Sequence, residues 1–347
     1  MNYSTPALII DLDIFEANLE EASKMVSGSG KFLRPHFKTH RTPALAQRQI
    51  CSEVIGFTCA TVGEVETLAD AGFDHLLLAN EVVSMDKIDK LASLAARVDL
   101  IVAVDSPSPL QDFNNACRRV GATIGVLADI DIGLNRCGVG APVDAEIIAT
   151  ESARLDCIRF RGLMGYEGRI RSHVPERSEK IQQAFSRLVE MKSHLEQKGF
   201  PVEIVSGAGT STMIEVLAAP IFTEIQAGTY CMMEPDILDL GLPFHCAAWI
   251  TGTVISTRPR RVVLDVGRRS VTADNGLPIP EPHHAKTLAV NDQHAILEWT
   301  GPLPALGELV RLRPTQNRTT FNLHEQVWLE RNRKIEERVP ITARGRS

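Results

Sequence analysis

The chain has 347 residues, enough for one large domain and a smaller one. Hydrophobic residues make up 44% of it and charged residues 23%, which is typical of a folded globular protein. The 37 basic and 43 acidic residues give a formal charge of −6, which argues against a general nucleic-acid binder. We expect no membrane helix and no signal peptide. Seven cysteines without a CxxC pair indicate free thiols in a reducing cytoplasm.

Eight short apolar segments recur along the first two thirds of the chain, with helical segments between them. The expected strands are 32–38, 54–60, 75–80, 99–105, 123–130, 159–166, 202–206 and 223–228. The expected helices are 43–50, 62–71, 85–96, 109–120, 143–151, 176–198 and 211–217. This pattern predicts a (β/α)8 TIM-type barrel. A doubly wound sheet is the alternative, but its Gly-rich fingerprint is missing after the first strand, where HFKTHRTP stands.

Beyond residue 240 the pattern changes to period-two alternation. It covers 249–256, 261–265, 295–299, 309–313 and 326–329, and predicts a mostly antiparallel β domain. We therefore assign 15–240 to the barrel, and 1–14 with 241–347 to the β domain. A strand at 7–11 precedes the barrel and is a candidate to pair with it. The polar tail 331–347 is expected to be loosely ordered at its end.

The chemistry of such barrels takes place at the C-terminal ends of the strands. After the seventh strand, SGAGTS at 206–211 supplies backbone N–H groups at the start of a helix, with hydroxyls beside them. GTY at 228–230 follows the eighth strand. Barrels often bind phosphate with these two loops, so the pattern favours a phosphate site, with ordinary Gly-rich turns as the alternative.

Lys38 ends the first strand, between His36 and His40. A lysine that burial keeps neutral can form a Schiff base with an aldehyde. A lysine on the first strand and a phosphate loop across the barrel are what pyridoxal phosphate (PLP) requires. In a strand, His36, Lys38 and His40 would share one face, so the histidines are also candidate metal ligands.

Several motifs together resemble the D-threonine aldolase and D-serine dehydratase group, PLP enzymes of fold type III with an alanine-racemase-like barrel. The matching stretches are TPALIIDLD at 5–13, RPHFKTH at 34–40, CATVGEVE at 59–66, DIGLNRCGV at 131–139, GYEG at 165–168, SGAGTS at 206–211 and QAGTY at 226–230. They follow the family order over almost the whole chain.

The resemblance implies a role for each matching residue. Lys38 would carry PLP and return as the base at Cα, Arg136 would lie at the cofactor ring, and His40 is a further catalytic candidate. The other candidates for the cofactor pocket are Tyr166, Ser206, Gly207, Gly209, Thr210, Gln226, Gly228 and Tyr230, of which Gly207, Gly209, Thr210 and Tyr230 would hold the phosphate. The resemblance also implies a homodimer in which the β domain of one subunit closes the active site of the other.

The chain departs from this group at the metal site. There a His and, two residues later, a Cys or Asp bind a divalent metal near the substrate β-hydroxyl, within P-x-H-x-C/D-x-T-x-N-x-H/D. In this register the ligand positions hold Gln316 and Arg318. Gln is a poor ligand for a zinc-type site and Arg stays protonated, so we predict no metal at this position. A different site built from His324, His294, His283 and His284 is a weaker alternative.

Our hypothesis is that the charge of Arg318 replaces the metal and binds a substrate carboxylate or polarises a β-oxygen. The expected function is a PLP-dependent aldolase or other lyase of D-β-hydroxy amino acids, independent of metal. A racemase or epimerase is the alternative, and a PLP-binding protein without turnover is a third possibility.

Overall fold

The computed structural model describes residues 3–168 and 170–347. The chain divides into two compact units. The barrel unit contains Ala22–Lys38, Gln49–Gly228 and Arg346–Ser347, and the β unit contains Met1–Glu21, Thr39–Arg48 and Thr229–Gly345. The domain boundaries expected from the sequence, 15–240 and 1–14 with 241–347, remain a prediction about folding units, which limited proteolysis can test.

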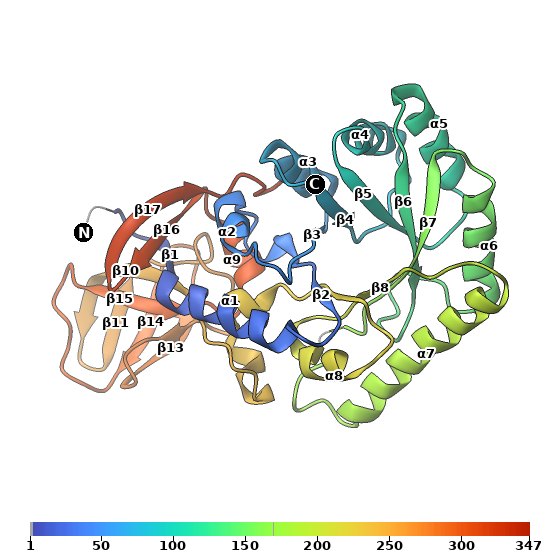
Figure 1. Cartoon of the computed structure of the whole chain (residues 1–347). Helices are drawn as coiled ribbons and strands as arrows, with labels where there is room; N and C mark the ends of the chain where they lie inside the picture. Colours follow the sequence, from blue (N-terminus) through green and yellow to red (C-terminus); the bar gives the residue numbers. More distant parts are fainter. Residues whose placement is uncertain (1–2, 169) are drawn as a thin grey trace. The chain divides into compact units, whose positions relative to one another are not determined.

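The barrel unit contains an eight-stranded parallel sheet in the order β2-β9-β8-β7-β6-β5-β4-β3 (Figure 1). Its strands are β2 (Phe32–Leu33), β3 (Phe57–Cys59), β4 (His75–Leu78), β5 (Asp99–Val104), β6 (Ile124–Ile130), β7 (Ile158–Gly165), β8 (Ile204–Gly207) and β9 (Glu224–Ile225). Parallel bridges from Leu33 to Val54 and from His36 to Thr58 join the first strand to the next one. The sheet therefore closes on itself, which confirms the predicted barrel.

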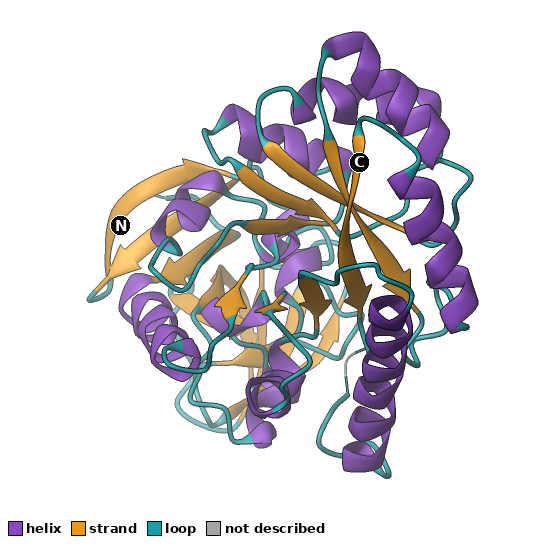
Figure 2. Cartoon of the chain, turned by 45° about the vertical axis from the view of Figure 1, so that its right-hand side comes forward, coloured by secondary structure: helices purple, strands orange, loops and turns teal. Residues whose placement is uncertain are grey.

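The helices of the barrel unit flank its strands (Figure 2). They are α3 (Val62–Asp70), α4 (Met85–Ala95), α5 (Leu110–Val120), α6 (Pro142–Ala153), α7 (Arg177–Gln197) and α8 (Met213–Ala218); α1 (Leu12–Val26) is divided between the units. On α7 the positions Ile181, Leu188, Met191 and Leu195 are buried, as their amphipathic spacing predicts. A core of Leu77, Ile101, Ala103, Leu127, Met164 and Ile204 fills the inside of the sheet.

The β unit contains a nine-stranded sheet in which only β1 and β16 pair in parallel among the described strands. The strands are β1 (Ala7–Asp11), β10 (Ala248–Arg258), β11 (Arg261–Leu264), β12 (Ile279–Pro280), β13 (Ala285–Val290), β14 (Ala295–Trp299), β15 (Leu309–Arg313), β16 (Gln326–Arg331) and β17 (Lys334–Pro340). The short helices α2 (Pro43–Arg48) and α9 (Asn317–Asn322) belong to the same unit. The predicted antiparallel β domain is confirmed.

At the ends of the chain, one expectation is wrong and one strand was missed. The first strand, β1, pairs with β10 and β16 and not with the barrel strands. Within the tail 331–347, which was expected to be loosely ordered at its end, Lys334–Pro340 pairs with β16 as strand β17, a strand that the sequence pattern did not predict. Its side chains are mostly exposed because it lies at the end of the sheet, so it lacks the apolar alternation that marks a strand.

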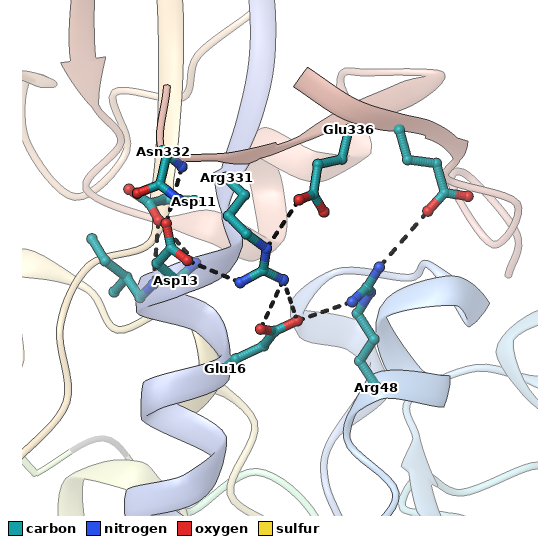
Figure 3. A network of polar contacts seen from close by, with 9 residues as sticks. Asp11, Asp13, Glu16, Arg48, Arg331, Asn332 and Glu336 are labelled. Atoms are coloured by element: carbon teal, nitrogen blue, oxygen red, sulfur yellow. Dashed lines mark hydrogen bonds and ion pairs between the residues drawn. The ribbon is translucent and has the colours of Figure 1, made fainter. Parts of the chain in front are cut away.

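A cluster of charges anchors the hairpin of β16 and β17 within the β unit (Figure 3). Arg331 donates from Nη1 to Asp13 Oδ1 at 2.9 Å, from Nη2 to Glu16 Oε1 at 2.9 Å and from Nε to Glu336 Oε1 at 3.0 Å. Arg48 donates to Glu16 from the other side. Asp13 and Glu16 lie in the first turns of α1, where the helix dipole favours negative charge.

In the described part of the chain, no helix is both long and apolar enough to span a bilayer.

Candidate active site

Lys38 stands on a turn directly after the first barrel strand. The hydrogen bonds of this strand continue past Leu33, because Arg34 N donates to Ile225 O at 2.9 Å and His36 N to Ala227 O at 3.2 Å. The chain then forms the 3-10 turn Phe37–Thr39, on which Lys38 is half-buried. The expectation of one strand over 32–38, with His36, Lys38 and His40 on one face, is therefore wrong. A period-two argument does not apply across a 3-10 turn.

The loop after β8 lies at the same end of the sheet, since β2 and β8 are both neighbours of β9. Ala208 has a φ of +62° and Gly209 is extended, and the 3-10 turn Thr210–Thr212 then leads into α8. Thr212 N donates to Gly209 O at 3.2 Å, which closes the turn. The carboxyl ends of three neighbouring strands thus bring together a primary amine and a turn rich in N–H and hydroxyl groups.

Two contacts join the predicted cofactor residues on neighbouring strands. Gln226, after β9, donates from Nε2 to Ser206 Oγ in β8 at 2.9 Å, and both side chains are buried. The Tyr166 ring, after β7, packs against the loop after β8: a Cβ atom on Gly209 would lie 3.4 Å from Tyr166 Cε2. The loops after β7, β8 and β9 therefore form one contiguous surface. Gly207, Thr210 and Gly228 are buried within it.

Glu167 follows Tyr166 and was not singled out from the sequence. Only 6% of this residue is exposed, and its Oε1 accepts a hydrogen bond from Thr212 Oγ1. Burial raises the pKa of Glu167 to about 7. The sequence signals were its place directly after the expected strand 159–166 and within the matching stretch GYEG at 165–168.

A group of acids lies beside the loop that carries Arg136. Asp129 in β6 is buried, and burial together with the neighbouring acid Glu81 raises the pKa of Asp129 to about 8. Asp105 Oδ2 accepts from Gly138 N at 3.2 Å. Arg136 itself is exposed, and its positive charge opposes this effect by lowering the pKa of Asp129. Sequence reasoning noted Asp105 at a strand end but missed Glu81 and Asp129.

Glu81, Asp105 and Cys137 hold one possible metal-ligand atom each, all within 4.8 Å of one another. Among the described residues this is the one group of three such side chains, and none of His283, His284, His294 and His324 belongs to it. His324 instead contacts Ser270 O through Nε2 at 2.7 Å, and burial lowers its pKa. His324 is therefore engaged in a hydrogen-bond contact with the backbone of the β unit.

Three predicted site residues belong to the β unit. His40 is buried, and its Nδ1 accepts from Thr42 N at 3.1 Å. Tyr230 is buried in the 3-10 turn Thr229–Cys231, with its ring 5.8 Å from that of Phe244. Arg318 lies on α9, where its carbonyl oxygen accepts from Arg41 Nη1 at 2.5 Å.

The two positions at which the metal ligands were expected to be replaced differ in their surroundings. Gln316 is buried, and its Oε1 accepts from Thr319 Oγ1 at 2.5 Å, so its amide oxygen is already engaged. The guanidinium of Arg318 is half-buried and makes no hydrogen bond or ion pair with the side chains that the structure describes. A guanidinium in this state is suited to bind an anionic group of a ligand.

The donor set at the barrel end fits PLP. The cofactor needs an amine for its aldehyde, donors for its phosphate and a flat surface for its ring. Lys38, the turn at 209–212 and the Tyr166 side chain supply groups of these three kinds at the ends of β2, β8 and β7. Glu167 Oε2, which is buried and has no hydrogen-bond partner among the described residues, marks a polar position next to the turn.

Comparisons with known proteins agree with this arrangement. Residues 10–235 match the family described as alanine racemase, N-terminal domain, and residues 247–329 match the putative serine dehydratase domain. The chain is 34% identical to D-threonine aldolase from Arthrobacter sp., over 98% of this chain and 93% of that protein. It is 29% identical to 3-hydroxy-D-aspartate aldolase from Paracoccus denitrificans (strain Pd 1222), over 99% of this chain and 92% of that protein.

The fold comparison leads to the same group. The crystal structure of D-threonine aldolase from Filomicrobium marinum superposes with a TM-score of 0.94 at 34% identity, covering 99% of this chain and 96% of that one. The matching alanine racemase sequences align over 50% of the chain or less, so they are distant relatives. The chain therefore belongs to the D-threonine aldolase and D-serine dehydratase-like family of fold-type III PLP enzymes, whose barrel is that of alanine racemase.

Proposed function

We propose that this protein is a PLP-dependent lyase that acts on D-β-hydroxy amino acids by aldol cleavage or dehydration. The observation that carries the proposal is the position of Lys38 and the loop after β8 at the same end of the barrel, in a chain that is 34% identical to D-threonine aldolase. The second domain supports a lyase because its family is that of a serine dehydratase.

When bound, PLP withdraws electrons from the amino-acid substrate and stabilises negative charge at Cα. In this proposal Lys38 holds the cofactor aldehyde and then moves a proton at Cα. The backbone and hydroxyl groups of Gly207, Gly209, Thr210 and Tyr230 bind the phosphate, and Ser206, Gln226 and Gly228 complete that wall. Tyr166 lines the ring and Arg136 orients it, while His40 is a candidate for proton transfer near the substrate.

Arg318 is proposed to take the place of a metal. The family ligand positions hold Gln316 and Arg318, and a guanidinium cannot coordinate a cation. The half-buried charge of Arg318 supports a role in binding the carboxylate or β-oxygen of the substrate. The proposed reaction is therefore independent of a divalent metal at this position. The Glu81, Asp105 and Cys137 group is not part of this proposal.

Racemisation is the second candidate, because removal and return of the proton at Cα needs the same cofactor and the same lysine. The alanine-racemase barrel favours it, but the two relatives described above, which align with 98% and 99% of the chain, are aldolases. A PLP-binding protein without turnover is a further possibility, against which the β domain argues. We also propose a cytoplasmic homodimer, from the free cysteines and from the family resemblance.

The test is product analysis by NMR in heavy water. PLP-loaded protein is given a panel of D-β-hydroxy amino acids that includes D-threonine and 3-hydroxy-D-aspartate, with a chelator present throughout. Glycine with an aldehyde establishes an aldolase, and an oxo acid with ammonia establishes a dehydratase. Deuterium at Cα with the Cβ bonds intact contradicts the lyase proposal and supports a racemase. Lys38→Ala, which has no amine, is the control for cofactor-dependent turnover.

A further inference from the structure

A buried carboxyl group supports the turn that is proposed to bind phosphate. Glu167 is 6% exposed, and Thr212 Oγ1 donates to its Oε1. Its Oε2 is buried and has no hydrogen-bond partner among the described residues. A carboxylate normally accepts several hydrogen bonds when it is buried with its charge, so this environment suits a neutral acid.

Among the described residues, the nearest charges do not neutralise Glu167. Arg177 on α7 pairs through Nη1 with Glu215 on α8, and donates from Nη2 to Ser211 O at 2.6 Å. No cation of the described chain lies within ion-pair distance of Glu167. Burial raises the pKa of Glu167 to about 7, the negative charge of Glu215 acts in the same direction, and Arg177 opposes them.

The carboxyl group is one side chain away from the turn itself. Thr212 Oγ1, which contacts Glu167, also accepts from Gly209 N at 3.4 Å, and Thr212 N donates to Gly209 O. A phosphate monoester at this turn carries a charge of about −1.5 to −2 at neutral pH. An ionised Glu167 would repel this charge in a dry environment, whereas a protonated Glu167 would not.

We propose that Glu167 is a positioning residue that must hold a proton for the turn at 209–212 to bind the cofactor phosphate. The inference rests on the proposed function, because it takes PLP as the ligand. With the proton present, the carboxyl group donates to Thr212 Oγ1, and the hydroxyl hydrogen of Thr212 can turn towards Gly209 O or the phosphate. Without the proton, Thr212 must donate to Glu167. Binding of PLP therefore takes up a proton at this carboxyl group as the pH rises above its pKa.

The experiment compares the dissociation constants of PLP and of pyridoxal, which has the aldehyde but no phosphate. Both are measured by equilibrium dialysis from about pH 6.5 to about pH 8.5. This range begins near the pKa of Glu167, about 7, and extends above it. The titration of Lys38 affects both ligands and cancels in their ratio. In the wild-type protein we expect the preference for PLP to fall about tenfold over this range. The phosphate becomes more fully ionised over the same range, which strengthens its binding and so cannot produce this fall.

Glu167→Gln keeps the shape of the side chain and stays neutral, so its preference for PLP should no longer fall as the pH rises, and should increase slightly as the phosphate ionises. Glu203→Gln is the matched control, because Glu203 is exposed before β8 and pairs with Arg161; it should keep the wild-type slope. Thr212→Val removes the hydroxyl and should weaken the binding of PLP but not that of pyridoxal. Thr212→Ser keeps a hydroxyl and should bind PLP as the wild type does. Far-UV circular dichroism checks that each variant is folded.

The outcomes separate this inference from the proposed function. If both ligands attach to Lys38 but the wild-type preference does not change with pH, this inference is overturned and the proposed function stands. The same holds if Glu167→Gln keeps the wild-type slope. If neither ligand attaches to Lys38, as judged by borohydride reduction and mass spectrometry, the proposed function fails and this inference fails with it.

Discussion

The guanidinium of Arg34 binds both carboxylate oxygens of Glu224 inside the barrel unit. Nε lies 2.8 Å from Oε1 and Nη2 lies 2.9 Å from Oε2, and neither residue is more than 4% exposed. Arg34 stands four residues before Lys38 and Glu224 lies in β9, so the pair joins the segment that leads from β2 to Lys38 to the neighbouring strand. The geometry is bidentate, which fixes orientation as well as distance.

We predict that Glu224→Gln lowers the free energy of unfolding by about 3–5 kcal/mol, because it leaves a buried guanidinium without a countercharge. Urea unfolding monitored by circular dichroism measures the change. Asp156→Asn breaks the exposed pair of Arg118 and Asp156 and should cost about 0–1 kcal/mol. Equal changes in the free energy of unfolding would show that the buried pair contributes no more to stability than the exposed pair.

Much of the barrel could be predicted from the sequence because its signals are local. The spacing of Ile181, Leu188 and Met191 is enough to predict α7, and eight apolar runs are enough to predict the sheet. The strands β13 and β17 were missed because they lie at the two ends of their sheet, where many side chains face solvent. Local patterns carry no information about which face of an end strand is covered.

The polar part of the site was harder to predict for a different reason. Glu167 and Thr212 are 45 positions apart, and Asp129 in β6 has Glu81, from the loop after β4, as its neighbour, so their environment exists only once the barrel is closed. The motif residues Lys38, Tyr166 and Gly209 could be identified because they occur in recognisable stretches. The 3-10 turn at Lys38 was not visible, since hydrogen bonding to β9 runs on to His36 before the chain turns.

The buried acid Asp129 predicts a specific dependence of stability on pH. Its pKa is about 8 in the fold and about 3.9 in an unfolded chain, so folding takes up a proton between these values. Stability should therefore fall as the pH rises through this window, and Asp129→Asn should remove this loss. We expect the variant to gain about 1–3 kcal/mol over the wild type between about pH 5 and about pH 8.

Urea unfolding at several pH values measures this difference. Asp74→Asn, at an exposed position between α3 and β4, controls for the loss of one negative charge. A stability difference between Asp129→Asn and the wild type that stays constant with pH would contradict the raised pKa.

Gly138 closes the loop that carries Arg136. Its φ is +105°, and a Cβ atom there would lie 2.5 Å from Asp131 N and 2.7 Å from Ile130 C, both of them backbone atoms. Gly138→Ala should therefore cost about 1–3 kcal/mol in backbone strain and weaken the binding of PLP. Gly140→Ala is the matched control, because nothing lies within 4 Å of a Cβ atom at that position. Thermal unfolding measures the stability of the two variants, and cofactor titration measures their affinity for PLP. Equal stability and equal affinity in the two variants would argue against a strained loop.

The exchange of the metal ligands for Gln316 and Arg318 can be tested by reversal. If the charge of Arg318 acts on the substrate, Arg318→Ala should lower kcat/KM by at least about 100-fold, the loss expected when a buried charge contact is removed. Arg318→Lys should recover only part of it, because an ammonium cannot form two parallel hydrogen bonds. Thr319→Ala, next to Arg318 on the same short helix, controls for disturbance of α9.

The double variant Gln316→His with Arg318→Cys restores the ligand pair expected from the family. It should gain activity that a chelator removes and zinc or manganese returns, while the wild type stays insensitive to both. Comparison of kcat/KM for D-threonine and 3-hydroxy-D-aspartate in each variant shows whether Arg318 selects an acidic side chain. Loss of wild-type activity on chelation would place a metal in the reaction and overturn the role assigned to Arg318, and the Glu81, Asp105 and Cys137 group would then be the first position to examine.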